Sequence, residues 1–374
     1  MHGEAGSTLR FAPDRLDDQT FLADADPGGM LLAVAASAAQ VRTGYRAAVE
    51  AGLPGLRGRP RAIVVTGMGG SAIVGDILAA VVGNGAPLPI LTVRSYQLPG
   101  WVGAADLVIA VSASGRTEET MSVATEAVRR GCSIVAVGSA GSPLESVARQ
   151  GSGIFVPVPV TGQPRANVWL LAVPLLVAAS ALGLTSADED LFEGVAKSLE
   201  DIAHRCRPSS ESFINPGKQL ALELAESIPM LWGASQVTSV AAYRLACQLN
   251  ENAKYPAVSG ELPEANHNQV VAFDGPLAER DVFADDGGRT LRLVMMRDAD
   301  EHPQVTRRRE ASVRMAHDRN VRVTELSAEG THPLERIASL IELGDFASVY
   351  LALGYGLDPT PVTAITELKA RISP

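Results

Sequence analysis

Two short segments of the chain combine glycine with hydroxyl side chains directly after an apolar run. The first is Thr66–Ile73 and the second is Ser112–Thr120. Small residues allow backbone N–H groups to approach an anion at the positive end of a helix, and hydroxyl groups supply further donors. We therefore predict a monophosphate site that uses backbone amides of these loops. The hydroxyl groups that could donate to the anion are those of Ser112, Ser114 and Thr117 in the second segment.

Other interpretations of these two segments stay open at the level of sequence. A glycine-rich turn can simply join a strand to a helix, and Thr117 can be a helix N-cap. The first segment is not a Walker loop, because no Gly-Lys-Ser/Thr follows its glycines, and Ala72 stands where the pattern G-x-G-x-x-G needs a third glycine. Two such loops at the carboxyl ends of strands in one sheet favour a phosphate site over coincidence.

The segments that must position these loops alternate between β-branched runs and helices. This alternation begins at Arg61 and is typical of a parallel sheet with helices on its faces. Asn167–Leu184 is apolar nearly all round, and its charged flanks favour a buried helix over a membrane span. The strands predicted in this half are Ala62–Thr66, Leu88–Val93, Asp106–Val111, Cys132–Val137 and Ile154–Val158.

A second alternation of strands and helices begins near Asn215. Its predicted strands are Ile228–Trp232, Leu291–Met296 and Val321–Glu325, and its predicted helices are Ser235–Glu251, Arg307–His317, Pro333–Leu353 and Val362–Ile372. We therefore predict an α/β fold of two tandem domains, each a parallel, flavodoxin-like sheet flanked by helices. The predicted divisions are a helical leader at 1–50, a first domain at 51–185, a connecting helix at 186–214 and a second domain with a C-terminal helix at 215–374.

Composition and charge exclude several classes of protein. With 374 residues, 46% apolar and 20% charged, the chain can bury two cores and is not a long disordered segment. The formal net charge of -10 disfavours nucleic acid and anionic membrane as partners, so the run Arg307–Arg309 is expected on a solvated helix face. Cys132, Cys206 and Cys247 are odd in number and widely spaced, which suggests core residues rather than disulfides or zinc ligands.

The acidic N-terminal segment and the histidine spacing lead to two further expectations. Met1–Asp18 carries acidic residues where a signal peptide needs a basic start and an apolar core, so we expect a cytoplasmic protein with no membrane partner. The histidines outside the motif at Glu264–Asn268 have no carboxylate or cysteine at metal-ligand spacing. No metal site is therefore expected.

Further motifs extend the pattern to a family resemblance. The two loops resemble those of the sugar isomerase (SIS) domain. With the segments below, which spread over most of the chain, they resemble the bifunctional phosphoglucose/phosphomannose isomerases. The resemblance implies two SIS domains, catalysis without metal or cofactor, and a homodimer with active sites at the subunit interface. The additional matching segments are Gly162–Ala166, Asn215–Gln219, Asn250–Lys254, Glu264–Asn268 and Asp358–Val362.

The resemblance also implies roles for individual residues. Glu251 falls on the base that moves a proton between C1 and C2, and His267 on the group that opens the sugar ring from the partner subunit. Arg165 falls on the arginine that steadies the oxyanion, and Lys369 is a further candidate for ring opening. Gly70, Ser71, Ser112, Ser114 and Thr117 would hold the 6-phosphate. The residue types agree, because aldose–ketose isomerisation needs a base, a proton shuttle for the ring oxygen and a cation for the enediolate.

The chain departs from the family pattern at a few positions. Ala113 and Arg116 replace an aromatic residue and an asparagine, and Asn167 replaces a small apolar residue. An arginine in a phosphate loop either adds a charge-assisted hydrogen bond or blocks the pocket. A sugar-phosphate-binding protein without turnover therefore stays open as an alternative.

A second alternative is a regulator that senses sugar phosphates, but it would need a basic helix-turn-helix segment, and the leader before Arg61 is too short and too acidic. The predicted function is isomerisation of glucose 6-phosphate, mannose 6-phosphate or both to fructose 6-phosphate through an enediolate. Such an enzyme serves glycolysis, gluconeogenesis and mannose metabolism.

Overall fold

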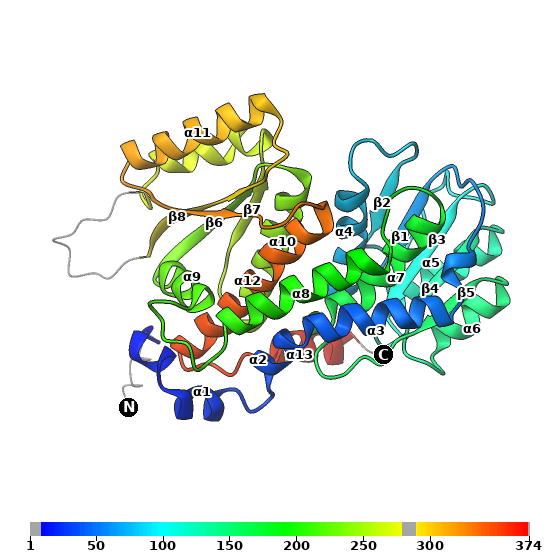
Figure 1. Ribbon diagram of the computed structural model, residues 1–374, viewed down its shortest axis with the longest axis horizontal. Helices are drawn as coiled ribbons and strands as arrows, with labels where there is room; N and C mark the ends of the chain where they lie inside the picture. Colours follow the sequence, from blue (N-terminus) through cyan, green and yellow to red (C-terminus); the bar gives the residue numbers. More distant parts are fainter. Residues whose placement is uncertain (1–8, 279–288, 373–374) are drawn as a thin grey trace. The chain divides into compact units, whose positions relative to one another are not determined.

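A computed structural model describes residues 9–278 and 289–372 of the chain (Figure 1). The contacts divide it into two compact units, which we name by their sheets. The five-stranded unit comprises residues 32–202 and 328–339, and the remaining described residues form the four-stranded unit. The units interleave along the chain, whereas the predicted divisions at 1–50, 51–185, 186–214 and 215–374 are consecutive segments and stay predictions.

The sheet of the five-stranded unit is entirely parallel and has the order β2-β1-β3-β4-β5. This is the order of flavodoxin-like sheets. Strand β2 lies on one side of β1, and β3, β4 and β5 follow in order on its other side. Every residue of β1 and β3 is buried, because helices cover both faces of the sheet. The strands are β1 Ile63–Thr66, β2 Ile90–Val93, β3 Leu107–Ser112, β4 Ser133–Gly138 and β5 Ile154–Pro157.

Two groups of helices accompany this sheet. Helices α3 and α4 both pack on α7, and α5 packs on α6. Helix α7 is buried along nearly its whole length, as its apolar sequence predicts. The helices are α2 Met30–Ala35, α3 Ser37–Glu50, α4 Ile73–Val82, α5 Glu118–Arg129, α6 Pro143–Gln150, α7 Val168–Ala181 and α8 Glu189–Arg205. The unit boundary falls within α2 and α8.

The sheet of the four-stranded unit is also parallel, in the order β7-β6-β8-β9. Its core contains the stacked rings of Trp232 and Phe273, whose centroids are 5.6 Å apart. Three strands match the predicted ones, and the edge strand β7 was not predicted. The strands are β6 Ser227–Gly233, β7 Val258–Glu261, β8 Thr290–Arg297 and β9 Arg322–Ser327.

The helices of the four-stranded unit include the long helix α12, within which the unit boundary falls. Among residues 9–278 and 289–372, α12 is the one helix with the length and apolar character to cross a membrane, and 94% of that span is buried in protein, as in a core helix. The helices are α1 Gln19–Ala25, α9 Pro216–Leu224, α10 Gln236–Asn252, α11 Pro303–Asp318, α12 Pro333–Gly354 and α13 Thr363–Ile372.

Several predictions about single elements can be compared with this fold. Cys132 and Cys206 are buried and Cys247 is half-buried, as expected of core or near-core residues. The predicted final helix is present as α13, but none of its residues is buried. Residues 1–8 of the predicted leader lie outside the described part of the chain.

Candidate active site

The first glycine-rich loop follows the carboxyl end of β1. The chain makes a single 3-10 turn, η3 Gly69–Ser71, and then enters α4. Gly69 has a φ of +53°, and a Cβ at Gly67 would lie 2.5 Å from the carbonyl oxygen of Ser71. Both positions therefore require glycine, and the tight turn brings Ser71 to the sheet edge, where its side chain is buried.

The second loop follows the carboxyl end of β3 and is held by its own hydroxyl groups. The Oγ of Ser112 lies 2.9 Å from the Oγ1 of Thr117 and also accepts from the Thr117 backbone N–H at 3.5 Å. Thr117 occupies the N-cap position of α5, but its side chain makes no capping bond. Thr117 is therefore the N-cap residue of α5 by position, but its hydroxyl bonds Ser112 instead of capping the helix.

The turn of this loop depends on Gly115, which has a φ of +63° and packs so closely on Ser142 that a Cβ would lie 2.1 Å from the serine Oγ. Ser114 and Arg116 are exposed at the tip of the turn, where the Ser114 Oγ accepts from the Arg116 backbone N–H at 3.2 Å. Ala113 is buried, and its carbonyl oxygen accepts from the Oγ of Ser139 at 2.6 Å. The two residues of this loop that depart from the family pattern thus differ in position. Ala113 packs inside the loop, and Arg116 lies at its rim.

The two loops meet at one edge of the sheet. Strands β1 and β3 are parallel neighbours, so their carboxyl ends lie together. The backbone N–H of Ala113 donates to the Oγ of Ser71 across this junction, at 3.4 Å. Ser71, Ser112 and Thr117 form a hydroxyl cluster beside the N-terminal ends of α4 and α5, with Ser114 at its rim. Such an edge is the usual ligand site of an open parallel sheet.

A third loop brings Arg165 against this cluster. Arg165 lies in the turn η4 Pro164–Ala166, and a Cβ on Gly70 would lie 3.2 Å from the Arg165 Cα. The absence of a side chain at Gly70 therefore lets the two backbones touch. The Arg165 side chain is 3% exposed, and its Nη1 donates to the Oε1 of Gln163 at 3.1 Å. The backbone of a buried arginine is thus packed on the glycine-rich loop.

Two residues that the motif did not identify hold this third loop. The Nδ2 of Asn167 donates to the carbonyl oxygens of Thr161 and Gln163, at 2.7 and 2.8 Å. The Nε2 of Gln40, on α3, donates to the carbonyl oxygen of Ala166 at 2.6 Å. Asn167 departs from the family pattern, yet it fixes the turn that carries Arg165. A polar side chain directly before an apolar helix was the signal available in the sequence.

The other predicted site residues lie in the four-stranded unit. Helix α10 joins the carboxyl end of β6 to the amino end of β7, so Glu251, in its last turn, lies at the amino edge of that sheet. His267 comes after the carboxyl end of β7, in the turn η5 Glu264–His267. The 17 residues of α10 span about 25 Å at 1.5 Å per residue. Glu251 therefore lies near the amino ends of the strands and His267 near their carboxyl ends, at opposite edges of one sheet.

The loop around His267 is held by its two flanking asparagines. The Nδ2 of Asn266 donates to the Oγ of Ser312 at 2.7 Å, and the Nδ2 of Asn268 donates to the Oε1 of Glu264 at 2.8 Å. The imidazole of His267 is exposed between them, while Glu251 is half-buried. Lys369 is also exposed, on α13.

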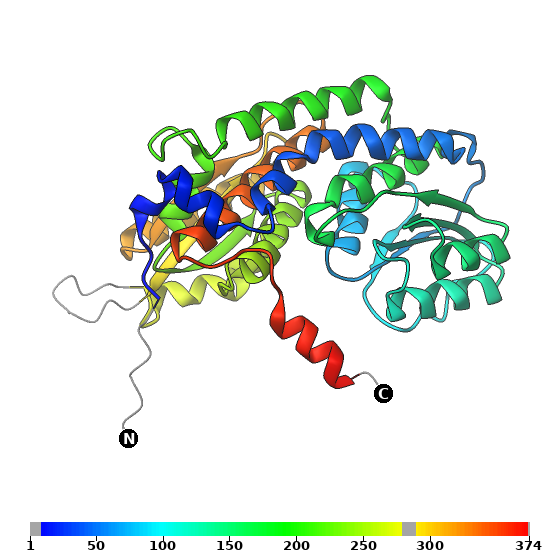
Figure 2. The same cartoon turned by 90° about the horizontal axis from the view of Figure 1, so that it is seen from below.

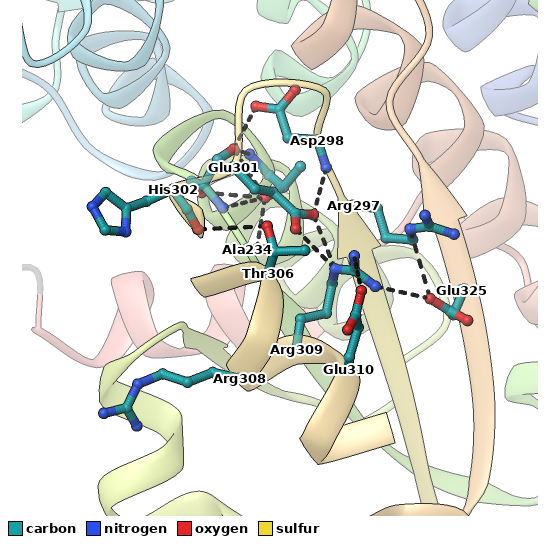
Figure 3. A network of polar contacts seen from close by, with 12 residues as sticks. Ala234, Arg297, Asp298, Glu301, His302, Thr306, Arg308, Arg309, Glu310 and Glu325 are labelled. Carbon is teal, nitrogen blue, oxygen red and sulfur yellow. Dashed lines mark hydrogen bonds and ion pairs between the residues drawn. The ribbon is translucent and has the colours of Figure 1, made fainter. Parts of the chain in front are cut away.

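The carboxyl edge of the four-stranded sheet is acidic rather than hydroxyl-rich (Figure 3). At the start of α10, the Oγ of Ser235 donates to the Oδ2 of Asp298 at 2.6 Å. A second ion pair lies nearby: the Nε of Arg309 donates to Glu301 at 2.9 Å, and both side chains are at least nine-tenths buried. The Nη1 of Arg309 also lies 3.6 Å from Glu325. A phosphate at this helix terminus would meet the carboxylate of Asp298.

The same network corrects one prediction. Arg309 was expected on a solvated helix face with its neighbours, but it is buried against Glu301. The acidic loop after β8 pairs with this arginine and buries it. The run of three arginines alone does not indicate that one of them has such a partner.

The structure thus brings together six of the predicted site residues on the five-stranded unit: Gly70, Ser71, Ser112, Ser114, Thr117 and Arg165. It places Glu251, His267 and Lys369 separately on the four-stranded unit. Among residues 9–278 and 289–372, no group of three or more His, Cys, Asp or Glu side chains is arranged to hold a metal ion.

Comparison with known proteins finds sequence relatives of this chain. Residues 213–372 match the model of the bacterial phospho-glucose isomerase C-terminal SIS domain. A bifunctional phosphoglucose/phosphomannose isomerase of Caldicellulosiruptor bescii is 34% identical over 311 residues, which cover 83% of this chain and 89% of that protein. One from Aquifex aeolicus is 32% identical over 314 residues, covering 83% and 90%.

Among solved structures, a hypothetical protein from Thermus thermophilus has a similar fold, with a TM-score of 0.70 at 16% identity over 95% of this chain and 94% of that one. Each of these two relatives matches over 83% of the chain, so the similarity extends into both α/β units. On this ground the chain belongs to the family of bifunctional phosphoglucose/phosphomannose isomerases.

Proposed function

We propose that the protein interconverts aldose and ketose forms of hexose 6-phosphates, turning glucose 6-phosphate, mannose 6-phosphate or both into fructose 6-phosphate. The observation that carries this proposal is the hydroxyl cluster. Ser71, Ser112 and Thr117 come from loops far apart in sequence and converge beside two helix N-termini, where backbone N–H groups favour an anion. With Arg165 packed on Gly70, the same edge offers donors for a phosphate and a buried cation.

The chemistry after binding is assigned to three side chains. His267 transfers the proton of the C1 hydroxyl to the ring oxygen, which breaks the bond between C1 and that oxygen and opens the ring. The carboxylate of Glu251 then takes the proton from C2, and the negative charge of the resulting enediolate is stabilised by Arg165. Glu251 returns its proton to C1 as the hydroxyl proton moves from O2 to O1, which leaves the ketose. General acid–base catalysis of this kind accelerates a step by about 10²–10⁴-fold.

The shared site of a homodimer is part of this proposal. Because Glu251 and His267 lie at opposite edges of one sheet, a single four-stranded unit does not present both to one sugar. A second copy of the chain supplies His267 instead, and Lys369 is a second candidate for ring opening. Helix α13, the red helix before the C-terminus in Figure 2, supports association. None of its residues is buried, and the apolar residues Ile365, Leu368 and Ile372 are exposed at helical spacing.

We further propose that the enzyme needs no metal or cofactor and works in the cytoplasm, in glycolysis, gluconeogenesis or mannose metabolism. The reaction moves protons only, and a carboxylate, an imidazole and a guanidinium suffice for it. A coupled assay in the presence of EDTA tests this point, and full activity with EDTA is the expected result.

The decisive experiment compares the wild-type protein with Glu251→Gln. Glutamine keeps the size of the side chain and its hydrogen bonds but is not basic. We expect kcat to fall by roughly 10²–10⁴-fold for every substrate, with little change in KM. Exchange of the C2 hydrogen with D2O, followed by NMR, should fall in parallel. The matched control is the exposed Glu211→Gln in the same unit, which should leave both measurements unchanged.

One outcome would favour a binding protein over an enzyme. If the wild-type protein binds glucose 6-phosphate but neither turns it over nor exchanges its C2 hydrogen, the catalytic roles are wrong. The departures at Ala113 and Arg116 would then be the first positions to revert, because both lie in the second phosphate loop.

A further inference from the structure

We propose that Lys254 is a positioning residue that holds the last turn of α10, and with it Glu251, in place for proton transfer. This inference rests on the proposed role of Glu251 as the base. Lys254 comes three residues after Glu251, just beyond the end of the helix. It would act on catalysis through the backbone and does not need to touch the substrate.

The lysine side chain joins two segments that are about 100 residues apart. Its Nζ donates to the carbonyl oxygen of Asn252 at 3.0 Å, and to those of Asp358 and Pro359 at 2.9 and 3.3 Å. The first carbonyl belongs to the end of α10, where a cation is favoured by the helix dipole. The other two belong to the segment between α12 and α13. One ammonium group therefore links the turn that carries Glu251 to the C-terminal segment.

The C-terminal segment is itself fixed, so the link has a firm attachment. The backbone N–H of Thr360 donates to the Oδ1 of Asp358 at 2.9 Å. Gly28 packs so closely on this segment that a Cβ would lie 2.1 Å from the Thr360 Oγ1. Lys254 thus fastens a helix end, which frays readily in isolation, to a packed part of the same unit.

Two other contacts hold the same turn from the sides. The Nδ2 of Asn252 donates to the Oγ of Ser348 on α12 at 2.9 Å, and both side chains are fully buried. The hydroxyl of Tyr255 donates to the carbonyl oxygen of Ser227 at 2.5 Å, at the start of β6. Glu251 therefore lies just ahead of three attachment points, of which Lys254 is the exposed one.

The backbone of Lys254 has a conformation that disfavours a lysine. Its φ is +54°, a left-handed conformation that glycine adopts without strain and a lysine does not. A position of this kind at a helix end is ordinarily glycine. A strained residue near a functional group is kept only when its surroundings compensate, and the three carbonyl contacts supply that compensation.

The test uses Lys254→Gly, which removes the link and relieves the backbone strain at once. Because these effects on stability oppose each other, we expect the melting temperature to change by no more than about 4 °C. We expect kcat to fall by about 10- to 100-fold, the loss that a displacement of about 1 Å causes. KM for glucose 6-phosphate should stay within about twofold, since the hydroxyl cluster is untouched.

The matched control is Asn320→Gly. Asn320 also has a left-handed φ, +58°, and lies in the same unit, in the turn before the opposite edge strand β9. It should keep the wild-type kcat. Lys254→Met, which removes the ammonium group but retains the backbone strain, is a second variant in case the glycine protein does not fold, and the same fall in kcat is expected.

The outcomes separate this inference from the proposed function. A wild-type kcat in Lys254→Gly and Lys254→Met overturns the positioning role, and so does a loss of kcat that only follows a loss of folded protein. If instead the wild-type protein is inactive, or Glu251→Gln is fully active, the proposed function itself fails. Only a fall in kcat for both Glu251→Gln and Lys254→Gly, with Asn320→Gly unaffected, supports both.

Discussion

The hydroxyl groups of the second loop differ in how they are held. Ser112 is fully buried and bonds Thr117, so it both builds the loop and faces its interior. Ser114 is exposed at the tip of the turn, where its Oγ accepts a single backbone N–H. A change at Ser112 would therefore disturb the loop itself, whereas a change at Ser114 tests ligand contact alone.

We expect Ser114→Ala to weaken binding of hexose 6-phosphates without lowering stability. A hydrogen bond to a charged phosphate oxygen is worth about 1–3 kcal/mol, which corresponds to roughly 5- to 150-fold in Kd. Calorimetric titration with glucose 6-phosphate measures this change. Ser122→Ala, on the outer side of α5, is the control and should bind normally. An unchanged Kd in Ser114→Ala would remove Ser114 from the site.

At the residue scale, local motifs identified the side chains that can do chemistry but not those that hold them. Ser71 and Thr117 stand in recognisable loops, and Glu251 and His267 stand in short motifs. Asn167 was noted only as a departure, because its two carbonyl partners lie on a turn whose shape the sequence does not specify.

At the element scale, the amino ends of β1 and β3 are joined by one ion pair. The Nε and Nη2 of Arg61 donate to the two oxygens of Asp106 at 3.0 and 2.7 Å, and the backbone N–H of Gly103 adds a third bond at 2.9 Å. Together these bonds hold the pKa of Asp106 below its ordinary value, with the bond from Arg61 as the largest cause. The folded protein therefore favours the charged carboxylate.

This lowered pKa predicts how stability depends on pH. A group with a lowered folded pKa stabilises the protein above its unfolded pKa and loses that effect as the pH falls through its folded pKa. We expect Asp106→Asn to lower the free energy of unfolding at pH 7 by about 1–2 kcal/mol, in the lower part of the range because Arg61 is exposed. Urea unfolding at pH 7, 5 and 3 should show the gap from wild type closing below about pH 4.

The exposed Asp24→Asn serves as the control for that series and should follow the wild-type protein at every pH. A gap between wild type and Asp106→Asn that stays constant down to pH 3 would contradict the ionic origin of the stabilisation.

Strands were predictable from sequence where both faces are covered. β1 and β3 are continuous apolar runs because helices pack on each side of the sheet. β7, with the sequence Val258–Glu261, lies at an edge, is only partly buried and contains a serine and a glycine, so nothing in its composition marks a strand. Its pairing with β6 is a tertiary effect.

At the scale of the whole molecule, the residues to which the proposed function assigns roles are divided between the two α/β units. The edge proposed to bind phosphate belongs to the five-stranded unit, whereas the corresponding edge of the four-stranded sheet carries Asp298. Glu251 and His267 occupy opposite edges of the four-stranded sheet. The motifs could not show this separation, because it follows from the direction in which α10 crosses the sheet.

Subunit mixing tests that arrangement. Glu251→Gln and His267→Ala should each be inactive on glucose 6-phosphate as homodimers. In a mixed dimer one site carries both substitutions, while the other combines the intact Glu251 of one chain with the intact His267 of its partner. Equal amounts of the two variants, denatured together and refolded, should therefore recover roughly a quarter of wild-type activity, because half of the dimers are mixed and each has one intact site of two. Refolding either variant alone should recover none, and refolded wild type sets the scale. If each chain instead used its own Glu251 and His267, no dimer in the mixture would contain an intact site, and activity would stay at the level of the separate variants.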